Sequence, residues 1–310
     1  MSGITVLCFA ASYSIALALE VAGLWVRYGW HRAAMVVMAV AGVVAHSIYL
    51  VTSATGDVAI LGSPANWCLV VAWVLAALYL WVVFSTPGSA TGLFVLPMVL
   101  GLIAFSQRAS LEPFAAERAS EFWSLLHGGL LMMATVTVCV GFLAGLMYLI
   151  QSWRLKKKIP FTSRFRLPSL ERLERTNSRS LGVSAVLVAG GFFSGVVLSR
   201  IRHGGEADYR LLADPVVLSL LSMLVWLVVA EVFRIVYPAA RRGRKVAYLT
   251  LAAFVFLLIT LVSFAATGEH GRPPKIEASQ HSRRSLRERV IERSATFVRG
   301  ANDNYAEAFS

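Results

Sequence analysis

Apolar stretches of about twenty residues recur along nearly the whole chain, and they limit its fold more than any other feature. A helix needs ~20 apolar residues to cross a bilayer, and it satisfies its own backbone hydrogen bonds in lipid. The 310 residues are 57% hydrophobic and only 15% charged, whereas soluble globular domains carry about 25% charged residues. We therefore predict an all-α protein, a polytopic integral membrane helix bundle.

Hydropathy predicts about eight transmembrane helices. Their expected ranges are Ile4–Val26, Ala33–Val51, Trp67–Ser85, Gly92–Phe105, Phe122–Trp153, Leu181–Arg200, Pro215–Tyr237 and Val246–Ala266. The first stretch is too long for a cleaved signal peptide and has no basic segment before it, so we expect it to span the membrane. The prediction is a transmembrane domain over residues 1–267 and a charged, partly disordered tail over residues 268–310.

The charge between these helices predicts how the bundle is oriented. Basic residues follow the first, fifth and seventh helices, as in Arg154–Lys158 and Arg241–Lys245, whereas the second connection carries only Asp57. Short basic loops stay in the cytoplasm, which places both termini outside. We predict a multi-pass protein of the cell inner (plasma) membrane. Its net charge of +12 then reflects topology and lipid contact, and we expect no nucleic-acid partner.

Two histidines lie inside predicted spans, His46 in the second and His127 in the fifth. An ionisable ring in a span usually has a partner or a function, and imidazole is a common ligand of haem iron. Both residues are expected at similar depth near the outer face, where they could coordinate one metal centre. The alternative is that each ring bonds a neighbouring carbonyl or hydroxyl group. His203 and His270 fall in outer connections, where they could reach the same site or be ordinary loop residues.

Glycines accompany the fifth and sixth predicted helices. Gly128 and Gly129 adjoin His127, where they could let a flat macrocycle approach the helix or could seat a neighbouring helix; we favour the second interpretation. Two further pairs have the small-xxx-small spacing typical of helix packing. They are Gly141 with Gly145 and Gly191 with Gly195.

Two carboxylates, Glu20 and Glu231, also fall in predicted spans. Glu231 shares a helix face with Arg234, and a self-neutralising cluster of all three is one interpretation; a proton or substrate pathway is the other. The chain has no Walker loop, GxSxG, HExxH or dinucleotide motif, and no CxxC or CxxCH. We expect its three cysteines to be buried core residues and the protein not to be an enzyme.

A series of short motifs runs in order through the fifth predicted helix and the chain after it. It comprises Trp123, Leu126-His127, Tyr148–Gln151, Leu155–Lys158, Leu167–Arg175 and Arg242–Ala247. The series resembles the membrane cytochrome c assembly family (CcsA/ResC- and CcmC-like proteins). The likeness covers residues 4–266, and His46 resembles the second-helix histidine of the HemX/YpjD-like branch.

Members of that family handle haem at the outer face, beneath a tryptophan-rich loop flanked by histidines. The resemblance implies that His127 and His46 are candidate ligands of haem iron, and that His270 follows the loop. The loop here has no tryptophan, and of the WGxxWxWDP signature only Asp214-Pro215 is present. Asp214 is therefore a candidate cofactor-binding residue, and so is Tyr209, the aromatic residue left to contact a porphyrin. The chain is therefore most similar to the HemX/YpjD-like branch.

Two functions follow from this resemblance. The first is a haem-handling protein that binds and presents haem during c-type cytochrome biogenesis, with a second biogenesis membrane subunit as partner. The alternative is a HemX-like regulator or scaffold of tetrapyrrole biosynthesis without haem, acting through its basic cytoplasmic loop, residues 154–179, on a soluble haem-synthesis enzyme. A transporter using Glu20 and Glu231 is least favoured because the sequence shows no internal repeat.

Overall fold

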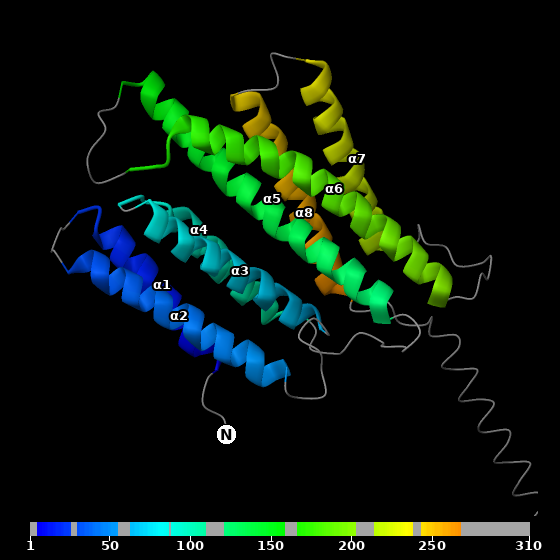
Figure 1. The fold of residues 1–310 in the computed structure, drawn as a ribbon, viewed down its shortest axis with the longest axis horizontal. Helices are drawn as coiled ribbons and strands as arrows, with labels where there is room; N and C mark the ends of the chain where they lie inside the picture. The colour runs from blue at the N-terminus through cyan, green and yellow to red at the C-terminus, as the bar shows by residue number, and fades with distance from the viewer. Residues whose placement is uncertain are drawn as a thin grey trace, which may run out of the picture. The chain divides into compact units, whose positions relative to one another are not determined.

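The computed structural model describes residues 5–25, 30–54, 63–86, 88–109, 121–158, 166–202, 214–237 and 243–267. These residues form eight helices and no strand (Figure 1), which confirms the all-α prediction. The helices are α1 (Val6–Ala22), α2 (His31–Ala54), α3 (Pro64–Ser85), α4 (Gly92–Ser106), α5 (Glu121–Lys156), α6 (Leu170–Arg202), α7 (Pro215–Val236) and α8 (Arg244–Thr267). All eight belong to one unit of the chain, Met1–His270.

Six of these helices are long and apolar enough to cross a membrane, namely α2, α3, α5, α6, α7 and α8. The other two, α1 with 17 residues and α4 with 15, are apolar but shorter. A multi-pass membrane protein is therefore the architecture that these helices support. The predicted tail lies outside the described residues.

Helix α6 begins eleven residues earlier than the hydropathy predicts, at Leu170 instead of Leu181. Its first three turns are polar, so they do not resemble a membrane span. They nevertheless bury one face, because Leu173, Asn177 and Leu181 recur at helical spacing and are all at most 3% exposed. The prediction of a loop here was wrong because a strongly charged segment can still be an amphipathic helix.

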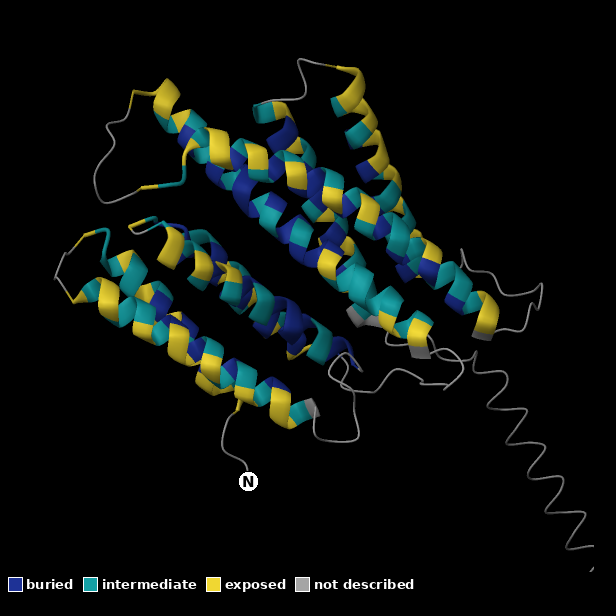
Figure 2. Ribbon diagram, viewed as in Figure 1, coloured by how far each residue is buried: buried dark blue, intermediate teal, exposed yellow. Residues whose placement is uncertain are grey.

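The helices pack mainly with their neighbours along the chain. The α5–α6 pair makes the most extensive contact, α1 packs on α2 and α4, and α8 joins α5 and α7. Buried faces turn inward and exposed apolar faces outward (Figure 2), as expected for a bundle surrounded by lipid. Cys68 and Cys139 are buried as predicted, but Cys8 is exposed on α1.

Contacts between helix ends bring the first, third, fifth and seventh connections between helices to the same side of the bundle. Glu20 at the end of α1 bonds the start of α4, and the backbone N–H of Ala90 donates to the carbonyl of Arg166 (2.7 Å). Arg244 at the start of α8 bonds Ser152 near the end of α5. We call this end the basic side, and the end that holds the first turns of α5 and the last turns of α6 the opposite side. That the basic side faces the cytoplasm stays a prediction.

Candidate functional site

His127 lies in the second turn of α5, at the opposite side, and its ring rests against α6. Its Nδ1 atom lies 2.8 Å from the carbonyl oxygen of Gly191, and the hydroxyl of Ser194 lies 3.4 Å away from the same nitrogen. A carbonyl can only accept, so Nδ1 carries the proton and donates it. In that tautomer the lone pair is on Nε2. A backbone carbonyl that holds the other ring nitrogen is the usual support of a metal-ligating histidine.

The glycines of α6 make this arrangement fit. A Cβ atom at Gly195 would lie 2.7 Å from Cε1 of His127, and one at Gly191 would lie 2.4 Å from Cδ2 of Leu131. Both distances are shorter than carbon atoms can approach, so a side chain at either position would displace Leu131 or the His127 ring from its close contact with α6. The predicted packing role of the Gly191 and Gly195 pair is confirmed. The structure also shows that Gly195 leaves the space in which the His127 ring lies.

Gly128 and Gly129 do not seat a neighbouring helix. A Cβ atom at either position would meet no described atom within 4 Å. The favoured sequence interpretation of this pair was therefore wrong within the described residues. The α5 backbone beside His127 is instead uncovered by the other described helices.

His46 lies at the core of the α1–α2 pair and is fully buried. Its ring stacks on Phe9 with centroids 4.1 Å apart and planes 3° apart, and Nδ1 lies 3.5 Å from the hydroxyl of Tyr13. Its Nε2 has no hydrogen-bond partner among the described residues. That nitrogen could bind iron chemically, but a porphyrin needs open surface around the ligating atom, and α1 covers it. As folded, His46 fits a packing role better than a haem-ligand role.

The structure does not bring His46 and His127 together. The first faces α1 and the second faces α6, and α2 makes no extensive contact with α5. No group of three or more His, Cys, Asp or Glu side chains that could hold a metal occurs among the described residues. As folded, His46 and His127 therefore do not form a shared ligand pair.

The other residues predicted for the site divide into two groups. Asp214 caps α7: its Oδ1 accepts a hydrogen bond from the backbone N–H of Val216 (2.8 Å), and Pro215 occupies the first helical position. Tyr209 and His270, like His203, lie outside the described residues. The Asp-Pro pair that the sequence links to the family signature thus starts a helix at the opposite side.

The two intramembrane carboxylates are not in one cluster, contrary to one interpretation of the sequence. Glu20 accepts hydrogen bonds from the hydroxyl of Tyr79 (2.9 Å) and from the backbone N–H of Gly92 (3.0 Å). Glu231 instead pairs with Arg234 along α7, and Arg234 also donates to the hydroxyl of Ser178 on α6. Glu20 and Glu231 each have their own hydrogen-bond or ion-pair partners. Neither a proton or substrate pathway nor a shared cluster is needed to explain these two carboxylates.

A polar seam between α5, α6 and α8 was not anticipated from the sequence. The Asn177 amide donates to the Thr250 hydroxyl (2.7 Å) and the Gly141 carbonyl (3.0 Å), and its oxygen accepts from the Ala247 backbone N–H (3.2 Å). A Cβ atom at Gly145 would lie 3.0 Å from the Thr250 hydroxyl oxygen. The predicted packing role of the Gly141 and Gly145 pair is confirmed, but the partners are polar.

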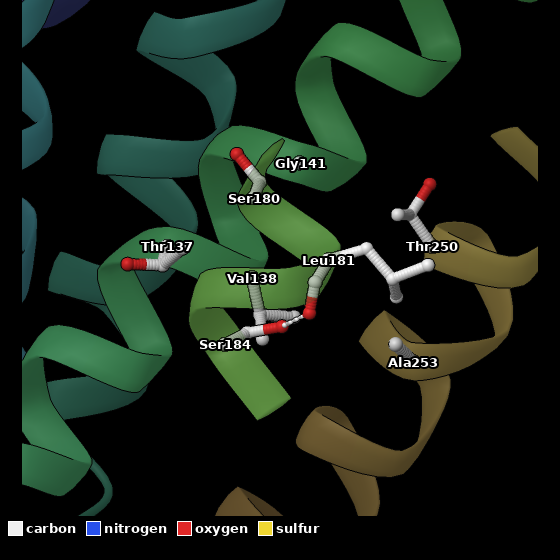
Figure 3. Close-up of a pocket in the computed structure, with 8 residues that line it drawn as sticks. All are labelled: Thr137, Val138, Gly141, Ser180, Leu181, Ser184, Thr250 and Ala253. Atoms are coloured by element: carbon white, nitrogen blue, oxygen red, sulfur yellow. Dashed lines mark hydrogen bonds between the residues drawn. The ribbon is translucent and has the colours of Figure 1, made fainter. Parts of the chain in front are cut away.

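A narrow gap opens beside this seam (Figure 3). It is lined by Thr137, Val138, Gly141, Ser180, Leu181, Ser184, Thr250 and Ala253. The Ser184 hydroxyl turns back to the carbonyl of Leu181 (2.9 Å), as Figure 3 shows, and Thr250 likewise bonds the carbonyl of Ala247 (2.9 Å). The Ser184 and Thr250 hydroxyls are thus both bonded within the protein, and the eight lining residues are all uncharged. The gap is a feature of helix packing and not a ligand site.

A family model of the cytochrome c assembly protein matches residues 58–270, which include α3 to α8 and therefore His127. The chain belongs to the cytochrome c assembly protein family. This membership supports a role in c-type cytochrome biogenesis. The match begins after His46, and assignment to the HemX/YpjD-like branch stays a prediction. Neither a curated protein nor a solved structure matches the chain.

Proposed function

We propose that this member of the cytochrome c assembly family binds haem at the opposite side of the bundle and presents it there, with His127 as an iron ligand. The observation that carries the proposal is the hydrogen bond from Nδ1 of His127 to the Gly191 carbonyl. It fixes the tautomer and orients the ring, as second-shell partners of metal ligands do. The uncovered backbone at Gly128 and Gly129 is compatible with a flat group beside the ring.

In this proposal haem is cargo, and the chain's residues bind and orient it without catalysing a reaction. Haem would be the iron porphyrin that a c-type cytochrome receives. The Ser194 hydroxyl, 3.4 Å from Nδ1 of His127, lies beside the bond that orients the ring. A second membrane subunit of cytochrome c biogenesis is the partner we propose, and the plasma membrane the location. His270 stays a predicted second ligand.

The alternative is a regulator that binds no haem and acts on a soluble haem-synthesis enzyme through its basic side. The observation that favours it is the surplus of exposed basic side chains there, including Lys156, Lys157 and Arg179. Charge reversal at these residues would then abolish function while His127→Ala would not. The haem proposal requires the opposite result.

The decisive test is the absorption spectrum of the purified full chain from haem-replete cells. We expect a Soret band in the wild type and its loss in His127→Ala. Added imidazole should restore the band in His127→Ala, because the truncated side chain leaves space for a free ligand. Rescue by imidazole would separate a lost iron ligand from lost packing against Gly195.

His46→Ala is the matched control, since it removes a second intramembrane imidazole. We expect this variant to keep the Soret absorbance per folded molecule, although it loses the stacking contact with Phe9. A colourless wild-type protein would contradict the proposal. Loss of haem in His46→Ala with retention in His127→Ala would move the site to the α1–α2 pair.

A further inference from the structure

The basic side carries a concentration of positive charge that haem binding at the opposite side does not use. Residues 151–158, 166–179 and 243–245 together hold ten basic and two acidic side chains. One of the acidic residues, Glu171, forms an exposed ion pair with Arg175 (2.8 Å), and such a pair contributes little energy. A large excess of positive charge therefore stays available to an anionic partner.

Three of these residues lie at the helix ends where α5 contacts α8. The Arg244 guanidinium donates from Nε to the Ser152 hydroxyl (2.9 Å) and from Nη2 to the Ser152 carbonyl (3.2 Å). Lys156 is one turn beyond Ser152 on the same face of α5, and Lys245 follows Arg244. Ser152 thus holds a guanidinium in place while both ammonium groups are exposed. We call Lys156, Arg244 and Lys245 the α5–α8 basic cluster.

Aromatic side chains show the depth of this cluster in the membrane. Trp153, Tyr237 and Tyr248 are 51%, 56% and 60% exposed, and each lies at an end of a helix on the basic side. The Lys157 ammonium lies over the Trp153 ring, 4.8 Å from its centre. Exposed tryptophan and tyrosine gather at the level of lipid headgroups. Trp153 and Tyr248 are each within one helical turn of the cluster, so the cluster lies at the depth of headgroup phosphates.

We propose that the α5–α8 basic cluster binds the phosphate of an anionic phospholipid headgroup. Guanidinium groups recognise phosphate through paired hydrogen bonds, and ammonium groups supply charge. A guanidinium already held by Ser152 needs less ordering when the headgroup arrives. A soluble acidic partner would approach from beyond the headgroups, whereas this cluster lies level with them.

The test is a lipid titration of the purified full chain, followed by native mass spectrometry. Phosphatidylglycerol is compared with phosphatidylcholine of the same acyl chains. We expect selective retention of phosphatidylglycerol by the wild type. The Lys156→Gln/Arg244→Gln/Lys245→Gln variant should bind it more weakly by on the order of a hundredfold, because each basic side chain near an anionic membrane contributes roughly fivefold.

A second variant, Lys156→Gln/Lys245→Gln, keeps the bond from Arg244 to Ser152 and guards against misfolding. We expect a loss of roughly twenty-five-fold on the same reasoning. The matched control, Arg108→Gln/Arg200→Gln, removes two exposed charges at the opposite side and should bind like the wild type.

Three results would overturn the inference. The first is equal retention of the two lipids by the wild type, and the second is unchanged phosphatidylglycerol binding in both cluster variants. The third comes from soluble probes: inorganic phosphate or a poly-glutamate peptide that binds the wild type as tightly as phosphatidylglycerol would mean that the cluster does not select a headgroup. None of these results depends on whether the chain binds haem.

Discussion

The position of the His127 ring depends on two glycines of α6. Gly195 allows the ring to lie against α6, and this position brings Nδ1 within 2.8 Å of the Gly191 carbonyl. A histidine that must orient one nitrogen toward a ligand needs its other nitrogen fixed. At the residue scale, the ligand role that we propose for His127 therefore depends on Gly195 as much as on the imidazole.

Gly195→Ala tests this dependence. The added Cβ would lie 2.7 Å from Cε1 and 2.9 Å from Nδ1 of His127, so the ring must turn and the bond to Gly191 must lengthen or break. Losing such an orienting contact typically weakens metal binding by roughly 10–100-fold. We expect a corresponding fall in haem affinity, measured by Soret titration of the apoprotein.

Gly190→Ala is the control on the same helix, because its Cβ would make an ordinary 3.4 Å contact with a flexible leucine, Leu130. We expect wild-type haem affinity in this variant. Equal losses in the two variants would mean that any bulk on α6 disturbs the site, and the orienting role of Gly195 would be abandoned.

At the scale of the element, α4 begins without a capping side chain of its own. Thr91 occupies the N-cap but makes no side-chain cap, and Glu20 from α1 accepts the bond from the Gly92 N–H instead. A carboxylate at a helix N-terminus is favoured by the helix dipole. A Cβ atom at Gly92 would lie 1.8 Å from the carboxylate oxygen of Glu20, so any other residue there would displace this carboxylate from the start of α4. One side chain thus ties α1, α3 and α4 together.

Glu20→Ala should therefore destabilise the bundle, because it leaves the Gly92 N–H and the Tyr79 hydroxyl without their acceptor. We expect a loss of about 1–2 kcal/mol, since hydrogen bonds between membrane helices contribute less than buried bonds in water-soluble cores. Unfolding in mixed detergent with increasing dodecyl sulfate measures the change. Glu171→Ala, which removes an exposed glutamate from an ion pair, should shift stability by less than about 0.5 kcal/mol. Identical unfolding curves for Glu20→Ala and the wild type would show that the Glu20 cap does not stabilise α4.

The sequence predicts elements well and contacts poorly, and α6 and Glu20 show why. Hydropathy finds spans because each span must be apolar by itself. The polar first turns of α6 fail that criterion, although Leu173 and Asn177 at helical spacing carry a detectable amphipathic signal. The two partners of Glu20, Tyr79 and Gly92, lie 59 and 72 residues away along the chain, and no local pattern specifies them. The contacts of His127 with α6 are also between residues far apart in the sequence. The sequence therefore identified His127 as a candidate ligand but not the α6 residues that orient its ring.

At the scale of the whole molecule, sidedness decides where haem would be presented. The α5–α8 basic cluster and His127 lie toward opposite sides of the bundle, because Lys156 ends α5 and His127 is in its second turn. The positive-inside rule predicts that the basic side faces the cytoplasm, and His127 would then lie near the outer face. A c-type cytochrome that receives haem outside the cytoplasm requires this orientation.

Accessibility of single cysteines tests the orientation. In a chain with Cys8, Cys68 and Cys139 replaced by serine or alanine, Arg108→Cys at the end of α4 should react with a membrane-impermeant maleimide in intact cells. Lys157→Cys at the end of α5 should react only after permeabilisation, because these two exposed residues lie on different sides of the bundle. If Lys157→Cys alone were labelled in intact cells, the bundle would have the opposite orientation in the membrane. His127 would then face the cytoplasm, and a haem bound there would be at the side where it is acquired and not at the side where it is delivered.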